Sequence, residues 1–132
     1  MATDNSPEIL SWRHALKYLN KKNIFFENMT VLPATSPLRI KKDLDSALKL
    51  INKKVDLVVS MSKARKYPNF NMLKKRGNYL VLYKKNTKYI HRRQDAHSVF
   101  DMTTLFYVIK TDYLIKTKYL LSGKILGVEI PK

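Results

Sequence analysis

The chain has 132 residues, of which 45% are hydrophobic, and this composition predicts one compact domain with a buried core. It contains no cysteine, which excludes disulfides, thiolate metal sites and cysteine nucleophiles, and His14, His91 and His97 lack the spacing of metal ligands. The net charge of +16 is large for this length and would attract polyanions.

The first half of the chain predicts two helices and two strands. Ser6 is the expected N-cap of a helix that begins at Pro7 and continues to about Asn20. A buried strand reaching Leu32 follows, and a helix over about residues 42–52 has apolar side chains at helical spacing. Residues 57–61 predict a second strand, parallel to the first because a helix connects them.

The second half is more strongly divided by turns. Pro68 and Gly77 interrupt a polar stretch before a strand over 79–83, which we expect in a hairpin or a protruding arm. A buried strand over 105–109, a short helix capped by Thr111-Asp112 and a closing strand over 124–130 complete the chain. The alternation of strands and helices predicts an α/β fold with a mostly parallel sheet.

A turn after the first strand is the clearest candidate site. The segment from Leu32 to Arg39 ends the strand with two prolines, two hydroxyl side chains and a guanidinium. In open α/β sheets, ligands bind outside the carboxyl ends of the strands. We therefore expect Thr35, Ser36 and Arg39 to face a crevice that holds an anionic substrate.

Four segments, in order, carry a resemblance to a known family. They are Asn5-Ser6-Pro7-Glu8, the run Leu32 to Arg39 (LPATSPLR), Phe70-Asn71-Met72, and Arg92-Arg93-Gln94-Asp95 followed by Asp101-Met102-Thr103-Thr104. Together they resemble the acylneuraminate cytidylyltransferases, which make CMP-activated sialic acids, and in particular the branch handling legionaminic- or pseudaminic-type sugars.

The resemblance implies a reaction and a fold. The family transfers CMP from CTP to a nine-carbon acidic sugar and releases pyrophosphate, with Mg²⁺ as a charge clamp. It implies that residues 1–132 form a single truncated cytidylyltransferase domain, a partial Rossmann-like nucleotidyltransferase with a protruding dimerisation hairpin over about 66–98. The resemblance also implies a homodimer. A cytoplasmic location with no membrane partner is expected, because the sequence has no membrane-length apolar run and no secretory signal pattern at its start.

Two family motifs are not found in this sequence. One is the glycine-rich loop that cradles the triphosphate, and the other is the acidic segment that supplies the aspartates for Mg²⁺. We therefore expect the magnesium ligands to lie outside this chain, and we expect weak or no turnover by the chain alone. We assign no metal ligand and no catalytic residue, because the aspartates are scattered and Asp43 and Asp45 fit helix-cap and dipole positions.

The resemblance also extends the list of candidate substrate-binding residues. Arg93 is the strongest addition, since an arginine can pair bidentately with a carboxylate, and it could act on the neighbouring subunit. Arg39 could instead set its loop, and Tyr107 fits a core position equally well. The complete set of expected substrate-binding residues is Thr35, Ser36, Arg39, Asn71, Arg93, Gln94, Thr103, Thr104 and Tyr107.

The charge leaves an alternative function open. A small basic module could bind nucleic acid through its lysines, with Tyr79, Tyr83 and Tyr89 as stacking residues. The lysines are scattered along the chain, which favours a solvated surface over a dedicated nucleic-acid face. This alternative also leaves LPATSPLR and DMTT unexplained, so we favour the cytidylyltransferase interpretation.

Overall fold

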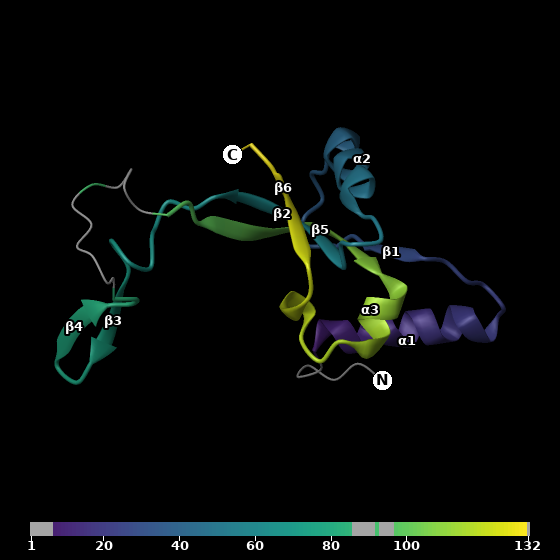
Figure 1. The fold of residues 1–132 in the computed structure, drawn as a ribbon, viewed down its shortest axis with the longest axis horizontal. Helices are drawn as coiled ribbons and strands as arrows, with labels where there is room; N and C mark the ends of the chain where they lie inside the picture. Colours follow the sequence, from purple (N-terminus) through teal and green to yellow (C-terminus); the bar gives the residue numbers. More distant parts are fainter. Residues whose placement is uncertain (1–6, 86–91, 93–96, 132) are drawn as a thin grey trace. The chain divides into compact units, whose positions relative to one another are not determined.

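The computed structural model describes residues 7–85, 92 and 97–131 (Figure 1). These residues form two compact units, which we describe separately. The first unit contains residues 7–61 and 102–131, and the second contains the described part of 62–101. Among the described residues, no helix has both the length and the apolar character needed to span a lipid bilayer.

Three α-helices of the first unit match the predicted ones to within a few residues. They are α1 (Glu8–Lys21), α2 (Lys41–Leu50) and α3 (Thr111–Lys116). Pro7 is the N-cap of α1, and the expected cap Ser6 lies outside the described residues. The side chain of Arg13 ties α1 to α3, because its Nε donates a 2.8 Å hydrogen bond to the carbonyl of Leu114.

The first unit is built on one four-stranded sheet. Its strands are β1 (Asn28–Val31), β2 (Leu57–Lys63), β5 (Phe100–Lys110) and β6 (Ile125–Glu129), in the order β1-β5-β2-β6. β1 pairs with β5 in antiparallel register, with Val31 opposite Tyr107. β2 pairs with β6 in parallel register, with Leu57 opposite Ile125.

The sheet departs from the mostly parallel arrangement that we expected, because one strand, β5, runs opposite to the other three. Lys110 N donates to Asp56 O at one end of the β2–β5 pair, and Ser60 lies beside Thr103 further along, so β5 runs antiparallel to β2 as well as to β1. The physical reason is that the chain leaves the sheet at the carboxyl end of β2 and returns as β5 at that same edge. β1 and β2 do run in the same direction, as expected, but β5 lies between them.

Apolar side chains cover both faces of this sheet. On one face, Trp12 and Leu16 of α1 and Leu114 of α3 pack against Leu57, Val59, Tyr107 and Ile109. On the other face, Ala47 of α2 packs against Val58, Phe106, Val108 and Val128. Figure 1 shows the same arrangement, with α2 on one side of the strands and α1 and α3 on the other. The unit is therefore a three-layer α/β structure.

The second unit contains a β-hairpin formed by β3 (Leu73–Arg76) and β4 (Tyr79–Leu82). Gly77 begins its two-residue loop with φ of 62°, a conformation that glycine adopts without strain and that suits a type II′ turn. The hairpin expected at 79–83 is confirmed, whereas its polar partner strand LKKR had no predictive pattern. The expected arm over about 66–98 falls within this unit, and its role in dimerisation stays a prediction.

Candidate functional site

The candidate site lies where β1 ends and β5 begins. Beyond Val31 the chain turns at residues 33–36, and Ser36 N donates a 3.3 Å hydrogen bond to Pro33 O. Because β5 is antiparallel to β1, its first residues lie at the edge where β1 ends. This topology brings the LPATSPLR turn next to the DMTT segment, although 68 positions separate Ser36 from Thr104 in the sequence.

Two hydroxyl groups meet at this edge. The Oγ of Ser36 and the Oγ1 of Thr104 are 3.1 Å apart, within hydrogen-bond distance, and either can be the donor. Thr35 and Thr104 are exposed, and Ser36 is half-buried. A hydroxyl can both donate and accept, so the side chains of Thr35, Ser36 and Thr104 can hydrogen-bond the hydroxyls of a sugar.

Arg39 holds the turn against β5. Its Nε donates a 2.7 Å hydrogen bond to Leu105 O, and its Nη2 donates to Pro33 O. Sequence reasoning left open whether Arg39 contacts substrate or sets the loop, and these bonds show that it sets the loop. The groups that it binds are backbone carbonyls, which makes Arg39 a positioning residue in this structure.

A second set of bonds, around Ser60, fixes the start of β5. Ser60 is fully buried on β2, and its Oγ accepts hydrogen bonds from Thr103 Oγ1 at 2.7 Å and from Leu105 N at 3.2 Å. The same Oγ donates to Thr103 O at 3.0 Å. The Thr103 side chain is thus directed to the sheet interior, while Thr104 lies beside Ser36. Sequence reasoning missed Ser60, whose signal was a single hydroxyl in the apolar run of β2.

Tyr107 lies in the core and not at the surface of the candidate site. Its side chain is buried, and its ring packs on Trp12 with centroids 5.2 Å apart and an interplanar angle of 48°. Burial raises the pKa of Tyr107, and the carboxylate of Glu8 raises it further. The core position that the sequence allowed for Tyr107 is the one observed.

The remaining expected residues belong to the second unit or to undescribed positions. The Oδ1 of Asn71 accepts a 2.6 Å hydrogen bond from Tyr67 N, so this side chain closes a local turn. Arg93 and Gln94 lie outside the described residues, while their neighbour Arg92 is exposed. The structure therefore brings together Thr35, Ser36, Arg39, Thr103 and Thr104 out of the predicted set.

No protein-family model and no curated protein matches this chain.

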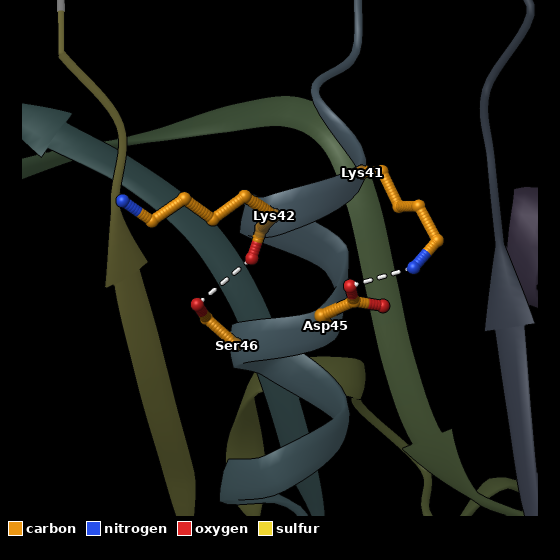
Figure 2. Close-up of polar contacts among 4 residues, drawn as sticks. All are labelled: Lys41, Lys42, Asp45 and Ser46. Carbon is orange, nitrogen blue, oxygen red and sulfur yellow. Dashed lines mark hydrogen bonds and ion pairs between the residues drawn. The ribbon is translucent and has the colours of Figure 1, made fainter.

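Basic side chains flank the turn where α2 begins. Figure 2 shows Lys41 and Lys42 extending to opposite sides of α2. Lys41 Nζ lies 2.9 Å from Asp45 Oδ2, and the side chains are 87% and 45% exposed, so water screens this ion pair and it contributes little stability. The N-cap of α2 is Ile40, which makes no side-chain cap bond, so the expectation that Asp43 or Asp45 caps the helix is wrong. Asp43 does lie in the first turn, where the helix dipole favours a carboxylate.

The described residues do not fit a magnesium site. Among them, no group of three or more His, Asp or Glu side chains could hold a metal ion. We therefore assign no residue of this part of the chain to the Mg²⁺ that the resemblance implies.

A pocket of about 730 Å³ lies at the opposite edge of the sheet, beside the start of β1 and the end of β5. Two of its polar side chains are already engaged with the backbone. Thr111 Oγ1 donates to Phe26 O at 2.8 Å, and Lys110 Nζ donates to Lys53 O at 2.7 Å. This pocket is remote in the sheet from the turn at 33–36, and we do not include it in the candidate site.

Proposed function

We propose that this chain carries the sugar-acid side of a nucleotidyltransferase site, in a protein that transfers CMP from CTP to a nine-carbon acidic sugar with release of pyrophosphate. The observation that supports this best is the contact between Ser36 and Thr104. It joins two of the four segments on which the resemblance depends, and it does so at the carboxyl end of β1, where ligands of open α/β sheets bind.

In this proposal the exposed hydroxyls recognise the sugar, and the basic side chains provide a favourable field for its carboxylate. Thr35, Ser36 and Thr104 would hydrogen-bond sugar hydroxyls, while Lys41 and Lys42 would attract the acid group. Arg39 and Ser60 would act indirectly, by holding the turn and the start of β5 in place. The expected Rossmann-like relationship, the dimer formed through the second unit and the cytoplasmic location belong to the same proposal.

The reaction requires positioning more than a protein nucleophile. The anomeric hydroxyl of the sugar acid loses its proton to solvent, and its oxygen forms a bond to the α-phosphorus of CTP. The bond from that phosphorus to the α–β bridging oxygen breaks, and pyrophosphate leaves with that oxygen. Such phosphoryl chemistry depends on alignment and on stabilising charge. Rigid attachment of the 33–36 turn to β5 would serve that alignment.

Sugar binding by the chain tests the proposal directly. We expect N-acetylneuraminate or a legionaminic-type acid to bind in ligand-observed NMR, while its methyl ester and a neutral hexose bind more weakly. Thr104→Val should weaken binding by about five- to tenfold, the usual worth of one hydrogen bond. Thr30→Val, a matched change at an exposed threonine of β1, should leave binding unchanged.

A pyrophosphate-release assay with CTP, Mg²⁺ and the sugar that binds then tests the reaction class. Slow turnover that depends on the acidic sugar supports the transferase, and the rate of this chain alone is expected to be low. Equal binding of neutral and acidic sugars, with no effect of Thr104→Val, would refute the proposal.

A further inference from the structure

The β3–β4 hairpin has two chemically different faces, which follow from its register. Neighbouring residues of a strand point to opposite sides, and paired residues share a side. Arg76 pairs with Tyr79, and Lys74 pairs with Val81, so these four residues lie on one face. The opposite face carries the two other pairs, Leu73 with Leu82 and Lys75 with Leu80.

Tyr83 belongs to the face of Lys74 and Arg76. Tyr83 N donates a 2.8 Å hydrogen bond to Met72 O, which extends the hairpin by one pair in the same register. Lys74 Nζ lies 5.6 Å from the centroid of the Tyr83 ring, a contact that requires both side chains on one side. We call the set Lys74, Arg76, Tyr79 and Tyr83 the tyrosine face.

The two rings of the tyrosine face are open to solvent. Tyr79 is 79% exposed and Tyr83 is 56% exposed, although tyrosine usually covers its ring against other side chains. Lys74 and Arg76 are exposed as well. Two accessible aromatic rings therefore lie among cations on one side of a short hairpin.

The sequence around the hairpin has a strong excess of positive charge. Residues 62–101 include eleven Lys or Arg and only two Asp, with no Glu. Such a field attracts phosphates and repels cationic partners. Charge alone would fit any polyanion, but exposed rings alternating with cations are the combination that binds unpaired bases, which stack while their phosphates contact the cations.

We propose that the tyrosine face binds single-stranded nucleic acid. Lys74 and Arg76 contact backbone phosphates, and Tyr79 and Tyr83 stack on bases. A duplex buries its bases, so it offers only its phosphates to this surface. The inference is independent of the sugar-nucleotide function, because it depends on the second unit alone.

Fluorescence anisotropy with a labelled 15-residue oligothymidylate tests this inference. We expect tighter binding of this probe than of a duplex of the same length, and heparin should compete only at high concentration. Tyr79→Leu keeps an apolar side chain without the ring, and we expect it to weaken binding by about five- to a hundredfold. Circular dichroism of each variant checks that the fold is unchanged.

Lys74 and Lys75 provide a matched pair, because they carry the same charge on opposite faces. Lys74→Ala should reduce the slope of log affinity against log salt by about 0.7, the effect of losing one phosphate contact to a single strand. Lys75→Ala should leave the slope unchanged. Equal effects of the two lysine changes on the slope would overturn the inference. So would a duplex that binds as tightly as the single strand, competition by heparin at low concentration, or no effect of Tyr79→Leu on binding.

Discussion

Replacing Arg39 by alanine should destabilise the first unit. The guanidinium donates to two backbone carbonyls, Leu105 O at 2.7 Å and Pro33 O, and its side chain is half-buried. A hydrogen bond from a charged donor contributes about 1.5–3 kcal/mol. Because water can replace part of these bonds at a half-buried site, we expect a loss of about 2–4 kcal/mol in the free energy of unfolding.

Urea unfolding followed by tryptophan fluorescence measures this loss for the first unit of the structure. Trp12 is the only tryptophan of the chain and lies buried in the core of the first unit, so its emission reports on that unit. The midpoint should fall in Arg39→Ala while the slope of stability against urea stays constant. Arg39→Lys should recover less than half of the loss, because an ammonium cannot reproduce the forked geometry.

Arg76→Ala is the matched control, since Arg76 is exposed on the hairpin of the second unit. Its free energy of unfolding should equal that of the unchanged chain within about 0.5 kcal/mol. An unchanged midpoint for Arg39→Ala would show that the bonds to Leu105 O and Pro33 O do not stabilise the first unit, and the guanidinium would then be free to bind a ligand.

Three further predictions concern the core and the hairpin. Ser60→Ala should cost about 1–3 kcal/mol in the free energy of unfolding, because it leaves the half-buried amide of Leu105 without the Ser60 acceptor, whereas Ser36→Ala should cost under about 0.5 kcal/mol. Urea unfolding compares the two. Tyr107 has a raised pKa in the folded chain, so the stability linked to its neutral form is complete below the ordinary value of 10.0 and is lost as the pH rises above it. In Tyr107→Phe the free energy of unfolding should therefore fall less between pH 8 and pH 11 than it does in the unchanged chain. An identical fall in the two proteins would contradict the raised pKa of Tyr107. If the opposite face of the hairpin, which carries Leu73, Leu80 and Leu82, forms the expected homodimer, Leu80→Glu should convert dimer to monomer in light scattering. A monomer before the change would contradict the dimer itself.

Much of the fold of the first unit could be predicted from local patterns. The helical spacing of Leu44, Ala47, Leu48 and Ile51 predicted α2, and the apolar run at 57–61 predicted the buried part of β2. These patterns are visible because each element must place apolar side chains on the core. The direction of β5 was not predictable, because it depends on where residues 62–101 return the chain to the sheet.

Strand β3 of the hairpin and the hydrogen bonds that support the candidate site could not be predicted from the sequence either. β3 reads LKKR and has no alternation of apolar and polar residues, since all four residues are exposed. Its pairing follows from the turn at Gly77 and from the apolar residues of β4. The candidate site was predicted as a turn with hydroxyls and an arginine, but the roles of Arg39 and Ser60 depend on contacts across more than forty residues of sequence.

The sugar site that we propose consists of the turn at residues 33–36 and the start of β5. Amide shift mapping of the ¹⁵N-labelled chain during titration with N-acetylneuraminate tests it most directly. We expect saturable shifts at Thr35, Ser36, Thr104 and Leu105, and much smaller shifts with a neutral hexose. Shifts confined to the second unit, or equal shifts with both sugars, would contradict it.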